Sequence, residues 1–242
     1  MNSPCLRDLR HMGAQMSIRF ICRGISGAWV QKRWDIYMRW ILRKLMDLTI
    51  CMNRKALKDA QLFAAELYHS EETAFIVNGS TAGLLAAIAG ICRDGGEILA
   101  ARNCHKAVYH AIELHHLKPY YIYPPINTKY GINEGIYPQD VEKMWITHQN
   151  IQAIVITSPT YDGVVSDIEA ICEIAHRHRV PVIVDEAHGA HFCFSDYFPK
   201  SAVACGADVV IQSTHKTLPA MTQTALIHLN GDLIDRERIR RM

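Results

Sequence analysis

Two apolar runs in the sequence end in residues that can do chemistry. Val180–Val184 is followed by Asp185, and Val209–Ser213 is followed closely by Lys216. Runs of this kind predict buried strands, and ligands of open parallel α/β sheets bind at the carboxyl ends of the strands. An ammonium just past a buried strand is costly unless it is paired or bonded. We therefore predict that Lys216 forms a Schiff base with an aldehyde cofactor, and that Asp185 binds the pyridine nitrogen of that cofactor.

A glycine and two hydroxyl residues lie where a phosphate could bind. Gly79, Ser80 and Thr81 follow a predicted strand and begin a predicted helix, so backbone N–H groups and two hydroxyls meet at the positive end of the helix dipole. The same residue types also serve as ordinary N-caps, and this motif alone leaves that alternative open. A Walker loop is excluded because no Gly-Lys-Ser/Thr follows at the required spacing.

The candidate residues also have structural interpretations. Asp185 could bond backbone amides at the end of its strand, and Lys216 could be a solvated surface lysine. Asp185, His188 and His191 share the D-x-x-H-x-x-H spacing of a metal site. A metal would leave Lys216 and the phosphate turn unexplained, so no metal is predicted. His191 is interpreted as a local structural residue.

The elements that must position these residues alternate between strand and helix from Ala56 onward. The alternation predicts an α/β fold with a mostly parallel central sheet. Pro138 is expected at the first turn of its helix, where the missing N–H does no harm. The predicted strands are 73–77, 97–101, 118–123, 151–157, 180–185, 208–213 and 224–229. The predicted helices are 56–69, 84–91, 105–116, 138–148 and 168–179, with a loop over 124–135 and a further helix beginning near the end of the sequence.

Five motifs in this region resemble those of one enzyme family. GSTAG, RNCHKAVYHA, SPTYDG, VDEAHGAH and STHKT occur in the order and rough spacing of the pyridoxal-phosphate domain of bacterial ornithine/lysine/arginine decarboxylases, in their shorter, Gram-positive-like form. The resemblance covers about Ala56 to Met242. It implies the large domain of the PLP-dependent, aspartate aminotransferase-like fold. It also implies pyridoxal 5'-phosphate as cofactor and decarboxylation of arginine, lysine or ornithine to an amine of the polyamine pathway and CO2.

The resemblance also implies a role for individual residues. His105 would stack on one face of the pyridine ring and touch the substrate carboxylate, and Ala187 would lie under the opposite face. His188 would lie near the substrate or the phosphate. Ser213 would add a hydroxyl to the phosphate site, and His215 would relay a proton when the product leaves.

The SPTYDG motif supports two interpretations. The resemblance implies that Thr160 and its loop lie beside the cofactor, whereas the Asp-Gly pair alone indicates an ordinary turn. The further partners implied by the resemblance are the amino acid substrate and a second copy of the chain, because active sites of this fold lie at a subunit interface.

Residues 1–55 differ from the rest of the chain. Residues 1–58 hold 12 Lys and Arg against 3 Asp and Glu, and three of the four Trp precede residue 41. No clear periodicity or family motif is legible there. We predict that 1–55 is a divergent or misread start, or an arm that packs on a partner subunit. We predict that 56–242 is the cofactor-binding major domain, truncated before a C-terminal domain.

Composition limits the class of protein. With 49% apolar and 21% charged residues, the chain can bury one large core. Its eight cysteines show no CxxC pair and are predicted to be reduced thiols. The start has no apolar core for a signal peptide, and the runs 83–92 and 29–52 are too short or too charged to cross a bilayer. A cytoplasmic protein without membrane contact is expected.

Three classes of function remain after these observations. The leading interpretation is a decarboxylase, favoured by His105 and by the pair His215–Lys216. An aminotransferase or lyase of the same fold would share Asp185 and Lys216. The second class is a truncated chain that binds cofactor without turnover. The third, nucleic-acid binding through the basic first segment, is not predicted, and it would require strongly salt-dependent affinity.

Overall fold

The computed structural model describes residues 54–242. The predictions for residues 1–53, including the partner-binding arm, lie outside the described residues. Within the described part of the chain, no helix is long and apolar enough to span a membrane. The five cysteines in this part are free, and three of them are buried, as expected for reduced thiols in a core.

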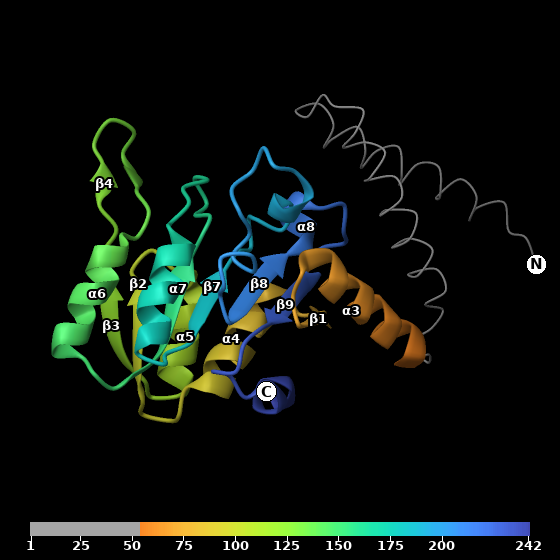
Figure 1. Ribbon diagram of the computed structural model, residues 1–242, viewed down its shortest axis with the longest axis horizontal. Helices are drawn as coiled ribbons and strands as arrows, with labels where there is room; N and C mark the ends of the chain where they lie inside the picture. The colour runs from red at the N-terminus through yellow and green to blue at the C-terminus, as the bar shows by residue number, and fades with distance from the viewer. Residues whose placement is uncertain (1–53) are drawn as a thin grey trace, which may run out of the picture. The chain divides into compact units, whose positions relative to one another are not determined.

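A seven-stranded sheet organises the described residues (Figure 1). Its strand order is β1-β9-β8-β7-β6-β2-β3. Only β9 runs antiparallel to its neighbours in this sheet, so the predicted mostly parallel arrangement is present. The strands are β1 (Glu72–Ile76), β2 (Glu97–Ala101), β3 (Lys118–Ile122), β6 (Ile151–Thr157), β7 (Val182–Asp185), β8 (Val209–Ser213) and β9 (Ala225–Leu229).

Helices follow the strands as the alternation predicts. Pro138 occupies the first turn of its helix, and the Asp167 carboxylate accepts a hydrogen bond from Ala170 N (3.1 Å) as the N-cap of the next one. The helices are α3 (Arg54–Tyr68), α4 (Gly79–Ile91), α5 (Lys106–Leu114), α6 (Pro138–Thr147), α7 (Ile168–Arg177), α8 (Thr214–Thr217) and α9 (Arg236–Arg241), with a short 3₁₀ turn at Phe192–Phe194.

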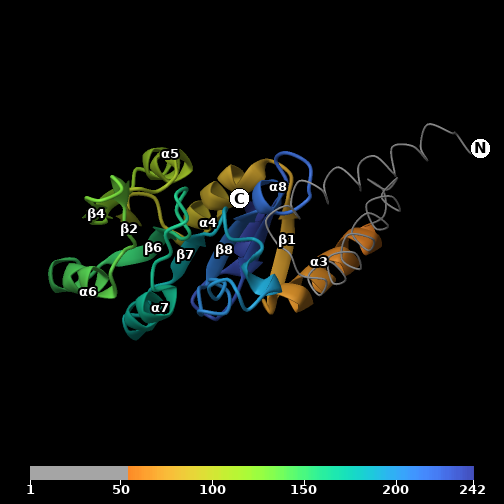
Figure 2. The same ribbon diagram turned by 90° about the horizontal axis from the view of Figure 1, so that it is seen from above.

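Two cores lie on the two faces of the sheet (Figure 2). The first, called the α4 face, is covered by α4 and α5 and includes Ile183 of β7. The second, called the α7 face, is covered by α6 and α7 and includes Val182 and Val184. Over β9 the same side is covered by α3, whose Tyr68 packs on His228 with ring centroids 4.7 Å apart. Successive strand residues point to opposite faces, so each strand contributes to both cores.

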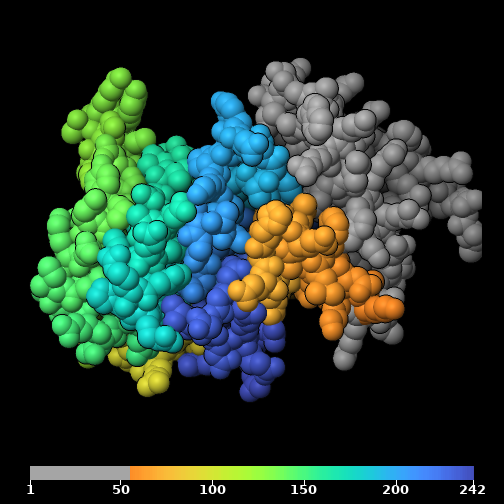
Figure 3. All heavy atoms as spheres, in the orientation of Figure 1, coloured from red at the N-terminus to blue at the C-terminus, as the bar shows by residue number. Residues whose placement is uncertain are grey.

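The structure differs from the predicted elements in small ways. The predicted loop 124–135 contains a two-stranded hairpin, β4 (Ile126–Asn127) and β5 (Ile132–Asn133), which projects from the surface in Figure 3. α4 begins at Gly79, as the Gly79–Thr81 motif predicts, and therefore extends beyond the apolar run 84–91. The predicted helix 105–116 begins at Lys106, because His105 acts as its N-cap and accepts a hydrogen bond from Ala107 N at 3.2 Å.

The parallel strands bring their carboxyl ends to one edge of the sheet. Thr157 at the end of β6 lies opposite Asp185 at the end of β7, and Asp185 lies opposite Ile211 near the end of β8. β8 leads directly into α8, which carries Lys216. The residues predicted to do chemistry therefore meet at this carboxyl edge.

Candidate cofactor site

Asp185 and Lys216 lie in the same site. Asp185 is the last residue of β7 and is 3% exposed. Burial raises the pKa of Asp185 to about 6, while the positive charge of Lys216 and a hydrogen bond from Ala187 N lower it. The roles of the two residues stay predictions.

Lys216 does not carry the cost of burial that its place after a buried strand predicts. Its side chain is exposed, so no cost of burial forces the ammonium to find a partner. Lys216 is nevertheless not simply solvated, because Nζ donates a hydrogen bond to Nε2 of His188 at 3.1 Å. Its position near two histidines and a buried carboxylate is what supports a chemical role.

Both neighbouring histidines favour the neutral form. Burial and the charge of Lys216 lower the pKa of His188, and the same two causes, in the same order, lower the pKa of His105. A neutral His188 accepts a hydrogen bond at Nε2. In His105, Nδ1 accepts the bond from Ala107 N, so the proton of the neutral ring lies on Nε2.

The predicted phosphate turn is joined to the end of β8. Ser213 Oγ donates a hydrogen bond to Ser80 Oγ at 2.9 Å, although 133 positions separate the two residues. Asn78 occupies the N-cap position of α4 and makes no side-chain capping bond. Ser80 and Thr81 therefore do not act as the N-cap, and the first turn of α4 keeps hydroxyls and backbone N–H groups that an anion can use.

Gly79 has a conformational reason to be glycine. Its φ is +73°, in the left-handed region that a Cβ disfavours. Its N–H donates to the Gln223 carbonyl at 2.8 Å. This bond ties the start of α4 to the segment between α8 and β9, beside Lys216 in the sequence.

The remaining predicted residues surround this site to different degrees. Ala187 is buried, and its N–H bonds Asp185 Oδ1 at 3.2 Å. The ring of Tyr161, next to Thr160, packs edge-on against His188 with centroids 5.7 Å apart. The imidazole of His215 donates from Nδ1 to the Thr224 carbonyl (3.0 Å) rather than contacting Lys216.

The SPTYDG motif forms the expected turn. Thr160 accepts a hydrogen bond from Val164 N at its hydroxyl (3.1 Å) and from Gly163 N at its carbonyl (3.0 Å). The two interpretations of the motif are thus compatible, because the turn lies next to His188.

Three unpartnered oxygens lie near the same edge and were missed by sequence reasoning. Asn103 Oδ1, Thr157 Oγ1 and Thr217 Oγ1 are buried and have no hydrogen-bond partner among the described residues. Buried polar atoms are normally satisfied, so these atoms fit a polar ligand. Thr157 could have been found by the signal that identified Asp185, since both end an apolar strand.

The chemical groups at this edge of the sheet fit pyridoxal phosphate, and they do not form a metal-binding cluster among the described residues. An amine, a buried carboxylate, a helix start with two hydroxyls and a small Ala187 side chain match the aldehyde, ring nitrogen, phosphate and ring face of that cofactor. Among residues 54–242, no group of three or more His, Cys, Asp or Glu could hold a metal. The ring of His191 packs edge-on against Phe192 and Phe198.

The fold and the site first define a class: an α/β protein with the large-domain architecture of aspartate aminotransferase-like enzymes, as predicted. The particular family follows from the sequence. Residues 36–242 match the family model described as Orn/Lys/Arg decarboxylase, major domain, and the chain belongs to this family. The match begins before Ala56, inside the segment predicted to be divergent.

Individual relatives agree with the family assignment. The chain is 42% identical over 184 residues to the uncharacterized Bacillus subtilis protein YaaO, covering 76% of this chain and 38% of YaaO. It is 36% identical over 179 residues to an arginine decarboxylase of Bacillus cereus, covering 74% and 39%. The crystal structure of Francisella novicida lysine decarboxylase LdcF superimposes with a TM-score of 0.67 at 28% identity, covering 77% and 28%. The chain thus spans less than half the length of these relatives.

Proposed function

We propose that this chain is the cofactor-binding domain of a pyridoxal-phosphate-dependent decarboxylase that converts arginine, lysine or ornithine to its amine and CO2. The observation that carries the proposal is the meeting of Lys216 with the buried, sparsely bonded carboxylate of Asp185. Family membership and the decarboxylase names of two relatives support a basic amino acid as substrate.

Specific residues would hold the cofactor. The amine of Lys216 would bind its aldehyde carbon, and Asp185 would accept the N–H of its ring nitrogen. Gly79–Thr81 and Ser213 would bind the phosphate, and His105 and Ala187 would contact the two ring faces. When bound, the cofactor supplies an electron sink for the pair released as the bond from Cα to the carboxylate breaks.

The residues of the chain supply orientation and charge. Neutral His188 already accepts a hydrogen bond from Lys216, so it would hold the Lys216 side chain in place beside the cofactor. At neutral pH, Asp185 is mainly ionised despite its pKa of about 6, so it can hold a protonated ring nitrogen. Its low exposure strengthens that interaction because little water screens it.

Covalent labelling tests the proposal. The 242-residue chain is incubated with pyridoxal phosphate, reduced with borohydride, digested and examined by mass spectrometry. We expect one label, on Lys216, and its loss in Lys216→Ala. The control Lys200→Ala changes a surface lysine that pairs with Glu169 at 3.0 Å and should keep the label. A missing label, or a label spread over several lysines, would contradict the proposal.

Amine release then tests the reaction. A separate preparation, incubated with pyridoxal phosphate but not reduced, is supplied in turn with arginine, lysine and ornithine, and CO2 and amine are measured. We expect release from at least one of them and none from Lys216→Ala. Accumulation of a keto acid would instead indicate an aminotransferase.

A second candidate function is binding of the cofactor without turnover. Asp185 and Lys216 would hold the cofactor whether or not an amino acid is decarboxylated. Specific labelling of Lys216 without CO2 release from any of the three amino acids would identify this function.

We also propose that a second copy of the chain covers the site. Several large apolar or aromatic side chains on the loops that follow the strands are exposed by 65% or more: Tyr123, Ile126, Tyr130, Tyr161, Tyr197 and Met221. A second copy of the chain would remove these exposed apolar side chains from water. Sedimentation analysis is expected to show a dimer at micromolar concentration, and a strictly monomeric chain would contradict this assembly.

A further inference from the structure

A second buried carboxylate lies immediately after Asp185, on the α7 face. Glu186 is 1% exposed and accepts three hydrogen bonds. The donors are Ala202 N at 2.7 Å, Ser201 Oγ at 2.9 Å and Gln212 Nε2 at 2.6 Å. Removing the Glu186 carboxylate should lower stability, because each of the three buried donors would lose its hydrogen-bond partner.

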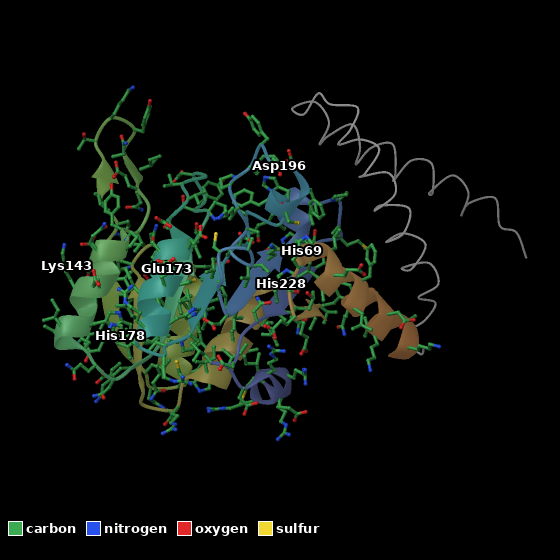
Figure 4. The ribbon with its side chains drawn as sticks, viewed as in Figure 1. His69, Lys143, Glu173, His178, Asp196 and His228 are labelled. Carbon is green, nitrogen blue, oxygen red and sulfur yellow. The ribbon has the colours of Figure 1, made fainter. Side chains whose placement is uncertain are left out.

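The bonding continues from Glu186 across three strands. Gln212 Oε1 lies 3.1 Å from His228 Nε2, and both side chains are fully buried. His228 Nδ1 lies 2.8 Å from Thr73 Oγ1, and Thr73 lies 2.7 Å from the Ser70 hydroxyl. His228 is labelled in Figure 4, in the region where β9 lies beside α3. The chain of bonds, called the Glu186 network, thus joins β7, β8, β9 and β1.

The Glu186 carboxylate sets the direction of every bond in this network. In its ionised form the Glu186 carboxylate only accepts, so Gln212 donates its amide N–H to Oε2 and keeps Oε1 for His228. Burial lowers the pKa of His228 to about 3, so the ring is neutral and its single proton lies on Nε2. Nδ1 then accepts from Thr73, and Thr73 accepts from Ser70.

The Glu186 network also supports the turn that carries Ala187 and His188. Glu186 N donates to Ile211 O and Gly189 N donates to Glu186 O, both at 2.9 Å. A Cβ built on Gly189 would lie 2.6 Å from Glu186 Cγ and 2.9 Å from Pro159 Cδ, so the turn lies directly against the Glu186 side chain. Pro159 in turn precedes Thr160.

The far end of the network touches the same turn through α3. The Tyr68 hydroxyl donates to the carbonyl of Ala190 at 3.0 Å. The Tyr68 ring packs on His228. The segment from Ala187 to Ala190 is therefore supported from Glu186 on one side and from Tyr68 on the other.

We propose that Glu186 is a positioning residue for the cofactor site: through its three donors and its contact with Gly189, it holds the turn that carries Ala187 and His188 opposite Lys216. This inference rests on the proposed function, since its consequence is cofactor affinity. Glu186 does not touch the cofactor. It acts from the opposite face of the sheet.

The test compares Glu186 with a matched buried carboxylate at the other end of the same sheet. Asp208 is 3% exposed, against 1% for Glu186, and accepts bonds from Val182 N and His176 Nε2, both at 2.8 Å. It precedes β8 instead of following β7. Both Glu186→Ala and Asp208→Ala should lose stability, and both are measured at a temperature where circular dichroism shows folded protein. Only the first should weaken pyridoxal phosphate binding, by about tenfold or more, because misplaced contacts are costly.

A second readout needs no cofactor. Hydrogen exchange of the backbone amides in residues 187–190 is followed by mass spectrometry in the unliganded chain. We expect Glu186→Ala to speed this exchange and Asp208→Ala to leave it unchanged. Equal effects of the two variants on exchange, or on cofactor affinity, would overturn the positioning role.

Conservative variants keep the inference testable where the alanine variant does not fold. Glu186→Gln can keep its contacts only if Gln212 turns over, which forces the proton of His228 from Nε2 to Nδ1. Nitrogen NMR of the histidine ring should detect that change, with cofactor affinity within about threefold of the original chain. The exchanged pair Glu186→Gln, Gln212→Glu should return the proton to Nε2. An unchanged His228 signal in Glu186→Gln would overturn the bond directions on which the inference depends.

Failure of the proposed function is visible separately. If the original chain takes no label on Lys216, the cofactor proposal fails, while amide exchange at 187–190 still decides whether Glu186 holds the turn. If Lys216 is labelled and Glu186→Ala binds cofactor as tightly as Asp208→Ala does, only the positioning role fails.

Discussion

Two carboxylates adjacent in sequence lie at the same edge of the sheet, on opposite faces and with opposite bonding. The Asp185 side chain, on the α4 face, accepts one hydrogen bond from the described residues, that of Ala187 N. Glu186, on the α7 face, accepts three. Burial is the largest influence on both and raises the pKa of Asp185 to about 6 and that of Glu186 to about 7.

The difference in hydrogen bonding distinguishes the candidate cofactor site on the α4 face from the network that supports it on the α7 face. On the α4 face, Asp185 has few partners, and the unpartnered oxygens of Asn103 and Thr157 lie at the same edge. On the α7 face, Gln212 and His228 have partners at both ends of their side chains. A ligand site must keep bonding capacity for the ligand, whereas a supporting network gains rigidity from using all of it.

The largest expected effect compares neighbouring residues of β8. Gln212→Leu removes both bonds of the buried amide, so Glu186 loses one of its three donors and His228 Nε2 loses its acceptor. We expect a loss of about 3 kcal/mol in the free energy of unfolding. Ser213→Ala, on the α4 face, removes only the bond to Ser80 and should cost about 1 kcal/mol. Urea denaturation measures both, and equal losses would contradict the distinction between the faces.

Asp185→Asn should separate binding from stability. We expect cofactor affinity to fall about 100-fold, because the ring nitrogen loses its ionic partner. The free energy of unfolding of the unliganded chain should stay the same or rise, because at pH 8 a buried carboxylate with a raised pKa is replaced by a neutral amide. Cofactor titration and urea denaturation on one preparation decide this, and a variant that loses stability together with affinity would show a structural role instead.

Acid sensitivity should come partly from His228. Burial lowers its pKa to about 3, whereas the unfolded chain binds the same proton near pH 6.5. This contribution to stability is present above pH 6.5 and is lost as the pH falls toward 3, at up to about 1.4 kcal/mol per pH unit. The raised pKa values of Asp185 and Glu186 act in the opposite direction over part of this range, since their contributions grow as the pH falls.

A paired variant isolates the histidine contribution. His228→Gln keeps an amide in the Glu186 network and cannot titrate, so its unfolding free energy should fall less between pH 6 and pH 4 than that of the original chain. Denaturation at several pH values measures the difference. Identical pH dependence in the two proteins would contradict a neutral, buried His228.

The smallest expected effect concerns two glycines with the same backbone conformation. Gly79 and Gly95 have φ values of +73° and +72°, so alanine at either should cost about 1 kcal/mol. Gly95 has open space around its position for a Cβ, within the described chain, and lies away from the candidate site. Thermal denaturation should show similar losses, whereas only Gly79→Ala should weaken cofactor binding.

Local patterns predicted most of the fold. Apolar β-branched runs and helical spacing identified the seven strands and the principal helices, because these elements follow from periods of two and 3.6 residues. The hairpin at β4 and β5 was missed, because strands of two residues carry too little pattern. The reason given for Lys216 was also wrong, since sequence did not show that its side chain is exposed.

The candidate site was partly predictable. Asp185 and Lys216 stand at the ends of strands that the sequence marks clearly, so their meeting at one edge followed from the parallel sheet. The hydrogen-bond partner of Lys216 was not predictable in the same way. Lys216 bonds His188, which is 28 positions away in the sequence, whereas the adjacent residue His215 bonds the Thr224 carbonyl.

By itself, the amino-acid sequence determined the alternation of elements, the family motifs and the strand ends at which chemistry could occur. Only the tertiary structure decided which face each polar side chain uses and which partners complete it. The physical reason is that strand register joins residues far apart in the chain, as in the bond between Thr73 and His228 across 155 positions. Asp185 ends β7 and keeps bonding capacity for a ligand, whereas Glu186, the next residue, points to the opposite face and is enclosed by hydrogen bonds within the protein.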